Sequence, residues 1–173
     1  MYEDFNGWLG ELPHRYKVVV PGNHDLLLEE PRNRSLITNA TLLVNSGVKI
    51  EGLRIWGSPV NLDGIAFRMT KPEERNRHWA RIPNALDILI THGPPLGILD
   101  VETGEQNHSG DPELLEAVNR VKPRLHVFGH IHGGYGSKAT EPTRFVNAAL
   151  YESGDLEKRP VLLELIPSKS GRR

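Results

Sequence analysis

The sequence predicts an α/β fold in which a sandwich of β-sheets is flanked by helices. Short β-branched runs alternate with amphipathic stretches, the runs end at glycine, proline or histidine, and the order strand, helix, strand recurs in the second half. The 173 residues suffice for one compact domain, and neither a repeat nor a linker divides them. We therefore expect a single domain over residues 1–173.

The first half of the chain predicts one helix followed by several short strands. Residues 3–12 place four apolar side chains at spacings of three and four, which is typical of a helix with one buried face. Residues 17–20 form a β-branched run that stops at Pro21, which indicates a buried strand. Further strands are expected at residues 42–44, 48–51 and 53–56, with a turn at Gly52 joining the last two.

The second half alternates predicted helices and strands. Thr70 and Glu73 are spaced as in a capping box, ahead of a charged helix through Arg81 whose side chains should mostly face solvent. Asp111 and Pro112 are suited to cap and begin another helix. Strands are expected at residues 86–91, 125–129, 143–149 and 161–166, followed by a polar tail at 168–173.

Composition excludes several classes of function. With 21 basic and 22 acidic side chains, the chain offers no basic surface for a nucleic-acid duplex or an anionic membrane. It contains neither an apolar run of about 18 residues, as a membrane span requires, nor a leader-like start. We therefore expect a cytoplasmic protein. Since cysteine is absent, any metal must be held by histidine, asparagine or carboxylate side chains.

Polar segments follow three of the predicted strands. In α/β sheets function collects beyond the carboxyl ends of strands, so these segments are expected to converge. A metal site requires such convergence, because its nitrogen and oxygen ligands must lie within about 2 to 2.5 Å of one ion. The segments are Gly22-Asn23-His24-Asp25, Thr91-His92-Gly93 and Gly129-His130-Ile131-His132.

The three segments resemble consecutive motifs of the calcineurin-like metallophosphoesterases. Their order and spacing make the resemblance specific, although each motif alone is a weak signal. Residues 5–10, 123–128 and 133–136 further resemble the metallophosphoesterase-domain-containing subgroup known from brain tissue, which includes cyclic-nucleotide phosphodiesterases. The resemblance covers nearly the whole chain and implies the sandwich fold of that family.

The resemblance also implies a hydrolase with two divalent metal ions, drawn from Mn, Zn, Fe or Mg. Asn23, His92 and His130 match ligands of one ion, and His132 matches a ligand of the other. Two adjacent cations clamp a phosphate and generate a hydroxide near neutral pH. The implied reaction is hydrolysis of a phosphodiester by direct attack of a metal-bound hydroxide.

The same resemblance assigns catalytic and substrate-binding residues. His24 matches the residue that interacts with a phosphoryl oxygen, and Asp25 would orient His24 or only cap a helix. Gly93 allows close approach of a phosphate, so Asn23, His24 and Gly93 form the expected substrate-binding set. The expected partner is a phosphoester, with a cyclic nucleotide as one candidate.

One departure from the family pattern bears on activity. The family carries an Asp-x-His and a Gly-Asp segment before its first motif here, and the sequence upstream of Gly22 contains neither. These segments would supply two ligands of the ion that His132 matches, and the aspartate that bridges both ions. We therefore expect an N-terminally truncated domain that holds one ion or none and needs upstream sequence for full activity. Three explanations stay open: a start at an internal methionine, which we favour, a deliberate fragment, and a natural short form.

The missing bridging aspartate also motivates a second class of function, a non-catalytic binding or scaffold module on the same fold. The other histidines receive structural interpretations. His14, His78 and His108 lie in loops or charged stretches and are expected to face solvent. His126 lies within a buried strand, where a hydrogen-bonded core histidine is the favoured interpretation.

Overall fold

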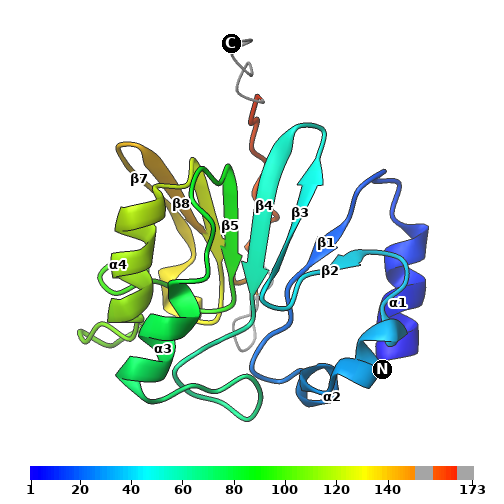
Figure 1. The fold of residues 1–173 in the computed structure, drawn as a ribbon, viewed down its shortest axis with the longest axis horizontal. Helices are drawn as coiled ribbons and strands as arrows, with labels where there is room; N and C mark the ends of the chain where they lie inside the picture. The colour runs from blue at the N-terminus through cyan, green and yellow to red at the C-terminus, as the bar shows by residue number, and fades with distance from the viewer. Residues whose placement is uncertain (151–157, 167–173) are drawn as a thin grey trace.

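The computed structural model describes residues 1–150 and 158–166 (Figure 1). Within these ranges no helix has the length and apolar character needed to cross a bilayer. The elements are, in chain order, α1 Tyr2–Glu11, β1 Val18–Val19, α2 Leu26–Glu29, the 3-10 helix η1 Pro31–Leu36, β2 Thr41–Leu42, β3 Ser46–Ile50, β4 Leu53–Ser58, α3 Pro72–Trp79, β5 Ile88–Thr91, α4 Pro112–Val121, β6 Leu125–Phe128, the 3-10 helix η2 His132–Gly134, β7 Gly136–Thr140 and β8 Thr143–Asn147.

A sheet with the strand order β3-β4-β5-β6-β8-β7 forms the centre of the molecule. Strands β4, β5, β6 and β8 are parallel neighbours, whereas β3 and β7 pair antiparallel at the two edges. In the register, Ser58 pairs with Thr91 and Phe128 pairs with Asn147. The carboxyl ends of the four parallel strands therefore lie along one edge of this sheet, where α/β proteins bind their ligands.

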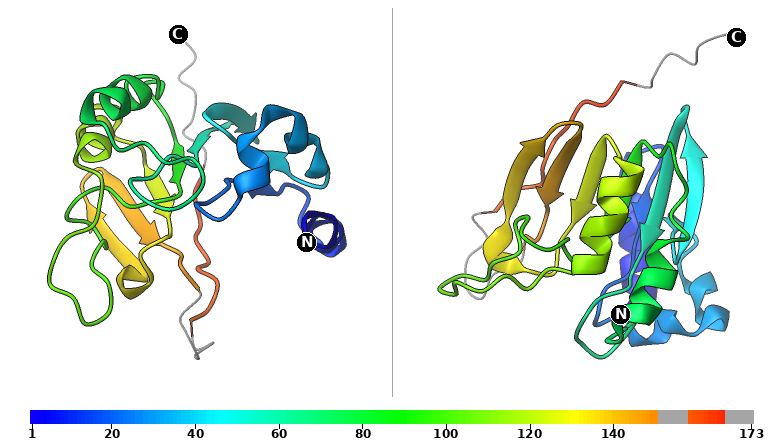
Figure 2. Two further views of the ribbon diagram at one scale, coloured as in Figure 1. Left: turned by 90° about the horizontal axis from the view of Figure 1, so that it is seen from below. Right: turned by 60° about the vertical axis from the view of Figure 1, so that its left-hand side comes forward.

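Helices α3 and α4 lie side by side over one face of the large sheet (Figures 1 and 2). Between these helices and the sheet lies the main apolar core, whose burial supplies much of the driving force for folding. Its fully buried members include Trp79, Ile82, Leu89, Leu114, Val118 and Phe128.

The small sheet of β1 and β2 packs against β4 of the large sheet. A Cβ atom on Gly57 would lie 2.7 Å from Cβ of Leu43 and 2.7 Å from a methyl carbon of Val20. Only glycine therefore allows the two layers to approach this closely. A separate apolar cluster covers the outer side of the small sheet and joins Leu9, Leu28, Ile37, Ala66 and Phe67. The predicted α/β class, with stacked sheets and flanking helices, is confirmed.

Several local predictions are confirmed by the structure. The helix predicted over residues 3–12 spans Tyr2–Glu11. The side chain of Asp111 caps α4 by accepting hydrogen bonds from the backbone N–H groups of Glu113 and Leu114, at 2.9 and 3.2 Å. The turn between β3 and β4 places Glu51 and Gly52 at φ of 46° and 86°, as a tight hairpin requires.

Other local predictions are wrong. Residues 161–166 form no strand, and Leu162 is 96% exposed. The segment pairs with no strand of the described structure, and a strand without a partner leaves its backbone groups unpaired. The capping box is also absent, because Lys71 occupies the N-cap of α3 and no side chain caps it. The predicted tail at 168–173 lies outside the described residues.

Three elements, η1, η2 and β7, were not predicted, and α2 was expected only through the alternative role of Asp25 as a helix cap. Strand β7 consists of Gly136–Thr140, in which small and polar side chains hide the usual β-branched signal. It forms because it pairs with β8 over five residue pairs. Tertiary pairing thus outweighs local propensity at this edge.

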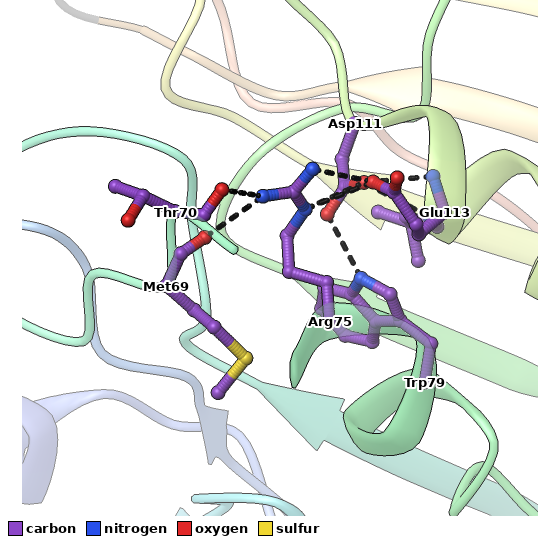
Figure 3. A network of polar contacts seen from close by, with 7 residues as sticks. Met69, Thr70, Arg75, Trp79, Asp111 and Glu113 are labelled. Atoms are coloured by element: carbon purple, nitrogen blue, oxygen red, sulfur yellow. Dashed lines mark hydrogen bonds and ion pairs between the residues drawn. The ribbon is translucent and has the colours of Figure 1, made fainter. Parts of the chain in front are cut away.

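Helix α3 turns a buried charge toward the core, although its charges were expected to face solvent. The Arg75 side chain is 6% exposed and pairs with Asp111 at 3.3 Å and Glu113 at 2.6 Å (Figure 3). It also donates to the carbonyl oxygens of Met69 and Thr70. The guanidinium therefore joins α3, α4 and the loop before α3.

Trp79 extends the Arg75 network. Its Nε1–H donates to Asp111 at 2.8 Å, so the carboxylate that caps α4 also receives hydrogen bonds from α3 (Figure 3). Burial, and after it the neighbouring Glu113, raises the pKa of Asp111, while the hydrogen bond from Trp79 and the charge of Arg75 act in the opposite direction. The contacts with Trp79 and Arg75 therefore offset part of the effect that burial has on this carboxyl group.

His78 also faces inward, which corrects the expectation that it faces solvent. It is 6% exposed, and its Nε2 lies 2.9 Å from Oγ of Ser58 at the end of β4. Burial, together with the charge of Arg81, lowers the pKa of His78 to about 4. The ring is therefore neutral at neutral pH and serves the packing of α3 on the sheet.

We predict that Arg75→Gln lowers the free energy of unfolding by about 3–5 kcal/mol, because Asp111 and Glu113 lose their buried counter-charge. Arg77→Gln is the matched control, since Arg77 is an exposed arginine in the same helix. It should change stability by less than about 0.5 kcal/mol. Urea unfolding followed by circular dichroism measures both. Equal effects of the two substitutions would contradict the structural role assigned to Arg75.

Gly134 in η2 packs directly on the backbone of a neighbouring loop. A Cβ atom there would collide with the carbonyl group of Leu99. We predict that Gly134→Ala destabilises the fold by about 1–3 kcal/mol through overpacking. Gly7→Ala provides the control, because nothing lies within 4 Å of a Cβ at this position in α1. It should stabilise the helix by up to about 1 kcal/mol, and a calorimetric comparison of melting temperatures distinguishes the two outcomes.

Candidate metal and phosphate site

The backbone ladder of the large sheet continues beyond the strand ends and brings two histidines together. The N–H of His92 donates to the carbonyl oxygen of Ser58 at 3.1 Å, and the N–H of Gly129 donates to that of His92 at 2.9 Å. His92 follows β5 and His130 follows β6, so the parallel register sets both at one edge. Their ring centroids lie 4.7 Å apart.

Asn23 reaches the same place from the small sheet, where it follows β1. Its Oδ1 lies 2.9 Å from Nε2 of His92. Its carbonyl oxygen accepts hydrogen bonds from the N–H groups of Ile65 and Ala66, in the loop after β4. A Cβ on Gly22 would lie 2.7 Å from the His92 ring, so glycine is needed for Asn23 to approach this closely.

His130 has an uncommon backbone conformation, with φ of +69°. Residues other than glycine rarely occupy this left-handed region, and such strain persists only where the surroundings enforce it. Here the Gly129 N–H is fixed to His92, and the N–H of Ile131 donates to the carbonyl oxygen of Gly129. The short turn thereby directs the His130 side chain toward the loop after β4.

The electrostatics favour a neutral His92. Burial, reinforced by the neighbouring His130, lowers the pKa of His92 to about 4, while Asp63 acts in the opposite direction. His24 and His132 also lower this pKa, so both lie near enough for their charges to act on His92. A neutral imidazole is the form that binds a metal, because it retains a lone pair.

The donor atoms fit a divalent ion in kind and in spacing. Two adjacent ligands that each lie about 2.1 Å from one ion are about 3 Å apart. Oδ1 of Asn23 and Nε2 of His92 lie 2.9 Å apart, close to this separation. In the structure Nε2–H of His92 donates a hydrogen bond to this amide oxygen, so an ion bound by both atoms would replace that proton. Across residues 1–150 and 158–166, however, no three His, Asp or Glu side chains are grouped so as to hold one ion. The amide oxygen is thus an essential member of any site here.

Two further candidates lie at the margin of this arrangement. His24 is exposed, as an approach to a substrate in solution requires. His132 is half-buried at the start of η2, and its carbonyl oxygen accepts a hydrogen bond from Nζ of Lys158 at 2.7 Å. Gly93 lies next to His130, since a Cβ on Gly93 would sit 4.0 Å from Cδ2 of that ring.

Asp25 has a different set of contacts from the one expected. Its carboxylate accepts hydrogen bonds from the Gly22 N–H at 2.6 Å and from the Tyr2 hydroxyl at 3.2 Å. It occupies the N-cap of α2 but makes no side-chain cap bond. In this structure Asp25 therefore fixes the turn that carries Asn23 and His24, instead of bonding to the His24 ring.

Asp63 is a member of the site that sequence reasoning missed. Its Oδ1 lies 2.8 Å from Nε2 of His130. Asp63, Gly93 and His130 also line a small pocket of about 20 Å³. The available signal was the segment Asn61-Leu62-Asp63-Gly64, in which a polar turn sequence follows a strand, as in the other three strand-end segments.

Two buried side chains beneath the site hold its loops. Asn147 ends β8, is fully buried, and donates from Nδ2 to the carbonyl oxygens of Leu99 and Ile131. His126 is fully buried as predicted, and its Nε2 lies 2.8 Å from Oγ1 of Thr91. Burial lowers the pKa of His126 to about 3, so this ring stays neutral.

His14 and His108 are exposed as expected, and neither lies in the Asn23, His92 and His130 group. His108 nevertheless has a structural contact, because its Nδ1 lies 2.7 Å from the buried carboxylate of Asp100. The same carboxylate accepts from the N–H groups of Gly97 and Gly110. Asp100 thus ties together the loop between β5 and α4.

Comparison with known proteins shows relatives of this chain. Human metallophosphoesterase domain-containing protein 1 is 41% identical over 174 residues, covering 84% of this chain and 53% of the relative. The UPF0046 protein K07C11.7 of Caenorhabditis elegans is 35% identical over 184 residues, covering 96% and 62%. The chain thus spans about half to three fifths of the length of these curated relatives.

Solved structures show the same fold at low identity. One crystal structure aligns with a TM-score of 0.66 and 19% identity, over 86% of this chain and 62% of its own. The protein TT1561 of Thermus thermophilus aligns with a TM-score of 0.55 and 17% identity, over 86% of this chain and 68% of its own. The model of the calcineurin-like phosphoesterases matches residues 2–134, which include all three strand-end segments. The chain therefore belongs to the calcineurin-like phosphoesterase family.

Proposed function

We propose that this chain carries part of a divalent-metal-dependent phosphoesterase site that acts on phosphodiesters. The observation that supports it most is the meeting of Asn23 with His92, 2.9 Å apart, beside the His130 ring. These donors come from both sheets and occupy the positions that match ligands in the family. We assign Asn23, His92 and His130 to one ion, and His132 to a second.

A divalent ion bound there would offset charge on the phosphoryl group and activate a water molecule. The chain's own residues would bind and orient the substrate. Exposed His24 is placed to donate a hydrogen bond or a proton to a phosphoryl or leaving-group oxygen. Asp25 acts on His24 indirectly, by holding the turn through the Gly22 N–H. The open Cα of Gly93 leaves room for a phosphate next to His130.

The proposed cofactor is one of Mn, Zn, Fe or Mg, because amide and imidazole ligands suit several of these ions and selectivity depends on geometry and supply. The proposed substrate class is the phosphodiesters, and a cyclic nucleotide is the first candidate to assay. The cytoplasmic location and the single domain over residues 1–173 stay predictions.

A second function, a non-catalytic binding module, is favoured by one feature of the site. The described residues contain no group of three His, Asp or Glu side chains able to hold an ion. The amide of Asn23 contributes no charge, so the assigned ligands of the first ion are all neutral. A module that binds a phosphoester without cleaving it would need no more than this.

We predict that His92→Ala weakens binding of Mn²⁺ by at least about 100-fold, since losing even an outer-shell partner costs about 10- to 100-fold. Isothermal titration calorimetry measures the affinity. A saturating ion raises the melting temperature of a protein that binds it, so the variant should also lose its Mn²⁺-dependent thermal shift. His14→Ala, an exposed histidine outside the site, is the control. Equal Mn²⁺ affinity in the two variants would contradict the ligand role of His92.

We predict that this chain, which carries part of the site, hydrolyses bis(p-nitrophenyl) phosphate slowly with Mn²⁺ present, and that His24→Ala lowers kcat by about 10²- to 10⁴-fold, the usual contribution of a general acid. Mn²⁺ affinity should not change, because His24 is not assigned as a ligand. Release of p-nitrophenolate provides the measurement, and His14→Ala is again the control. Mn²⁺ binding with no turnover of this diester or of a cyclic nucleotide would favour the binding module instead.

A further inference from the structure

The contact between Asp63 and His130 determines which nitrogen of the His130 ring carries the proton. Oδ1 of Asp63 lies 2.8 Å from Nε2 of His130, within the range of a short charge-assisted hydrogen bond. A carboxylate only accepts hydrogen bonds, so Nε2 of His130 must be the donor. In the neutral ring the lone pair then resides on Nδ1. Within the described residues no hydrogen bond to this Nδ1 occurs, so it is available to a ligand.

The loop that carries Asp63 is fixed to the other donors. Residues 65 and 66 donate their N–H groups to the carbonyl oxygen of Asn23, at 3.3 and 3.0 Å. Gly64 has φ of +90°, and a Cβ there would lie 2.5 Å from Cβ of Asn23. The Phe67 N–H donates to the Glu29 carboxylate at 3.0 Å. The loop therefore cannot shift without moving Asn23, so Asp63 keeps a fixed position relative to Asn23.

Asp63 also supplies the charge that the assigned donors of the first ion lack. Asn23, His92 and His130 are neutral when they bind a metal, whereas Asp63 brings a carboxylate next to them. Its charge also acts on His92, whose pKa it raises against the effect of burial. Histidines that ligate metals commonly donate their other ring N–H to a carboxylate, which fixes the tautomer and makes the ligand more basic.

We propose that Asp63 is the positioning residue of this site, holding His130 in the Nε2–H tautomer so that Nδ1 faces its metal ion as a ligand. The inference rests on the proposed metal-dependent function. Asp63 is not assigned as a direct ligand, because among the described residues the carboxylate, His92 and His130 are not grouped closely enough to hold one ion. Asp63 therefore acts through His130 and does not replace the bridging aspartate of the family.

The first test needs no metal. Long-range ¹H–¹⁵N NMR of the histidine rings in the full 173-residue chain reports which nitrogen of His130 carries the proton. The expected result is the Nε2–H tautomer in the parent chain and a mixture of tautomers in Asp63→Ala. Asp63→Asn should retain the Nε2–H tautomer, because its amide oxygen still accepts. An unchanged tautomer in Asp63→Ala would overturn the proposal, whatever the chain does with metals.

The second test uses Co²⁺, with affinity measured by calorimetry and coordination by visible absorption. Asp63→Ala should bind Co²⁺ about 10- to 100-fold more weakly, with an unchanged spectrum at saturation. Asp63→Asn should lose less affinity. Glu73→Gln removes one exposed negative charge from α3 and is the matched control, with no change expected. Because the Asp63 side chain is 69% exposed, the melting temperature of the metal-free variants should stay the same.

The outcomes separate the two proposals. A parent chain that binds no Co²⁺ contradicts the metal-dependent function. The NMR experiment then still decides whether Asp63 sets the tautomer of His130. Binding that is equal in the parent chain and Asp63→Ala overturns the positioning role alone. Tighter binding in Asp63→Ala also overturns it, because Asp63 would then compete with the ion for Nε2 of His130. An altered Co²⁺ spectrum would make Asp63 a ligand, against the proposal.

Discussion

The candidate site depends on the parallel register of β4, β5 and β6, which continues one step past the ends of the strands. Hydrogen bonds from His92 to Ser58 and from Gly129 to His92 keep the first residues of each loop in the ladder. The two imidazoles are therefore positioned by the sheet and not by flexible loops. Asn23 joins them because Gly57 and Gly22 let the small sheet approach. Rigid placement of this kind is what a site with fixed donor geometry requires.

Side chains far from the metal donors maintain this placement. The buried carboxylates of Asp100 and Asp111 each collect several hydrogen bonds; Asp100 holds the middle of the long segment between β5 and α4, and Asp111 holds its end at α4. Arg75 then joins that segment to α3. Networks of this kind define one arrangement when every member is satisfied. The site and the helical layer are therefore one structural unit, even though no helix contributes a proposed ligand of the first ion.

Sequence reasoning predicted the parts of the structure that local patterns determine. Strands with β-branched runs, the capped helix at Asp111 and the three strand-end segments all follow from residue type and spacing. It failed where distant partners decide: β7 forms only because β8 pairs with it, and the segment 161–166 stays irregular despite a strand-like pattern. Asp63 was missed for the same reason, since its role depends on a contact with His130, which is 67 positions away in the sequence.

Asn147 is a position where a chemical change would disturb the structure although the side chain keeps its volume. Its amide group uses both kinds of hydrogen-bonding capacity, because Nδ2 donates to Leu99 and Ile131 while Oδ1 accepts from the Ala149 N–H. An aspartate has the same outline, but the oxygen that replaces Nδ2 would face the carbonyl oxygens of Leu99 and Ile131 in a dry interior. Deamidation of Asn147 would therefore push apart the turns that surround η2, although the volume of the side chain stays the same.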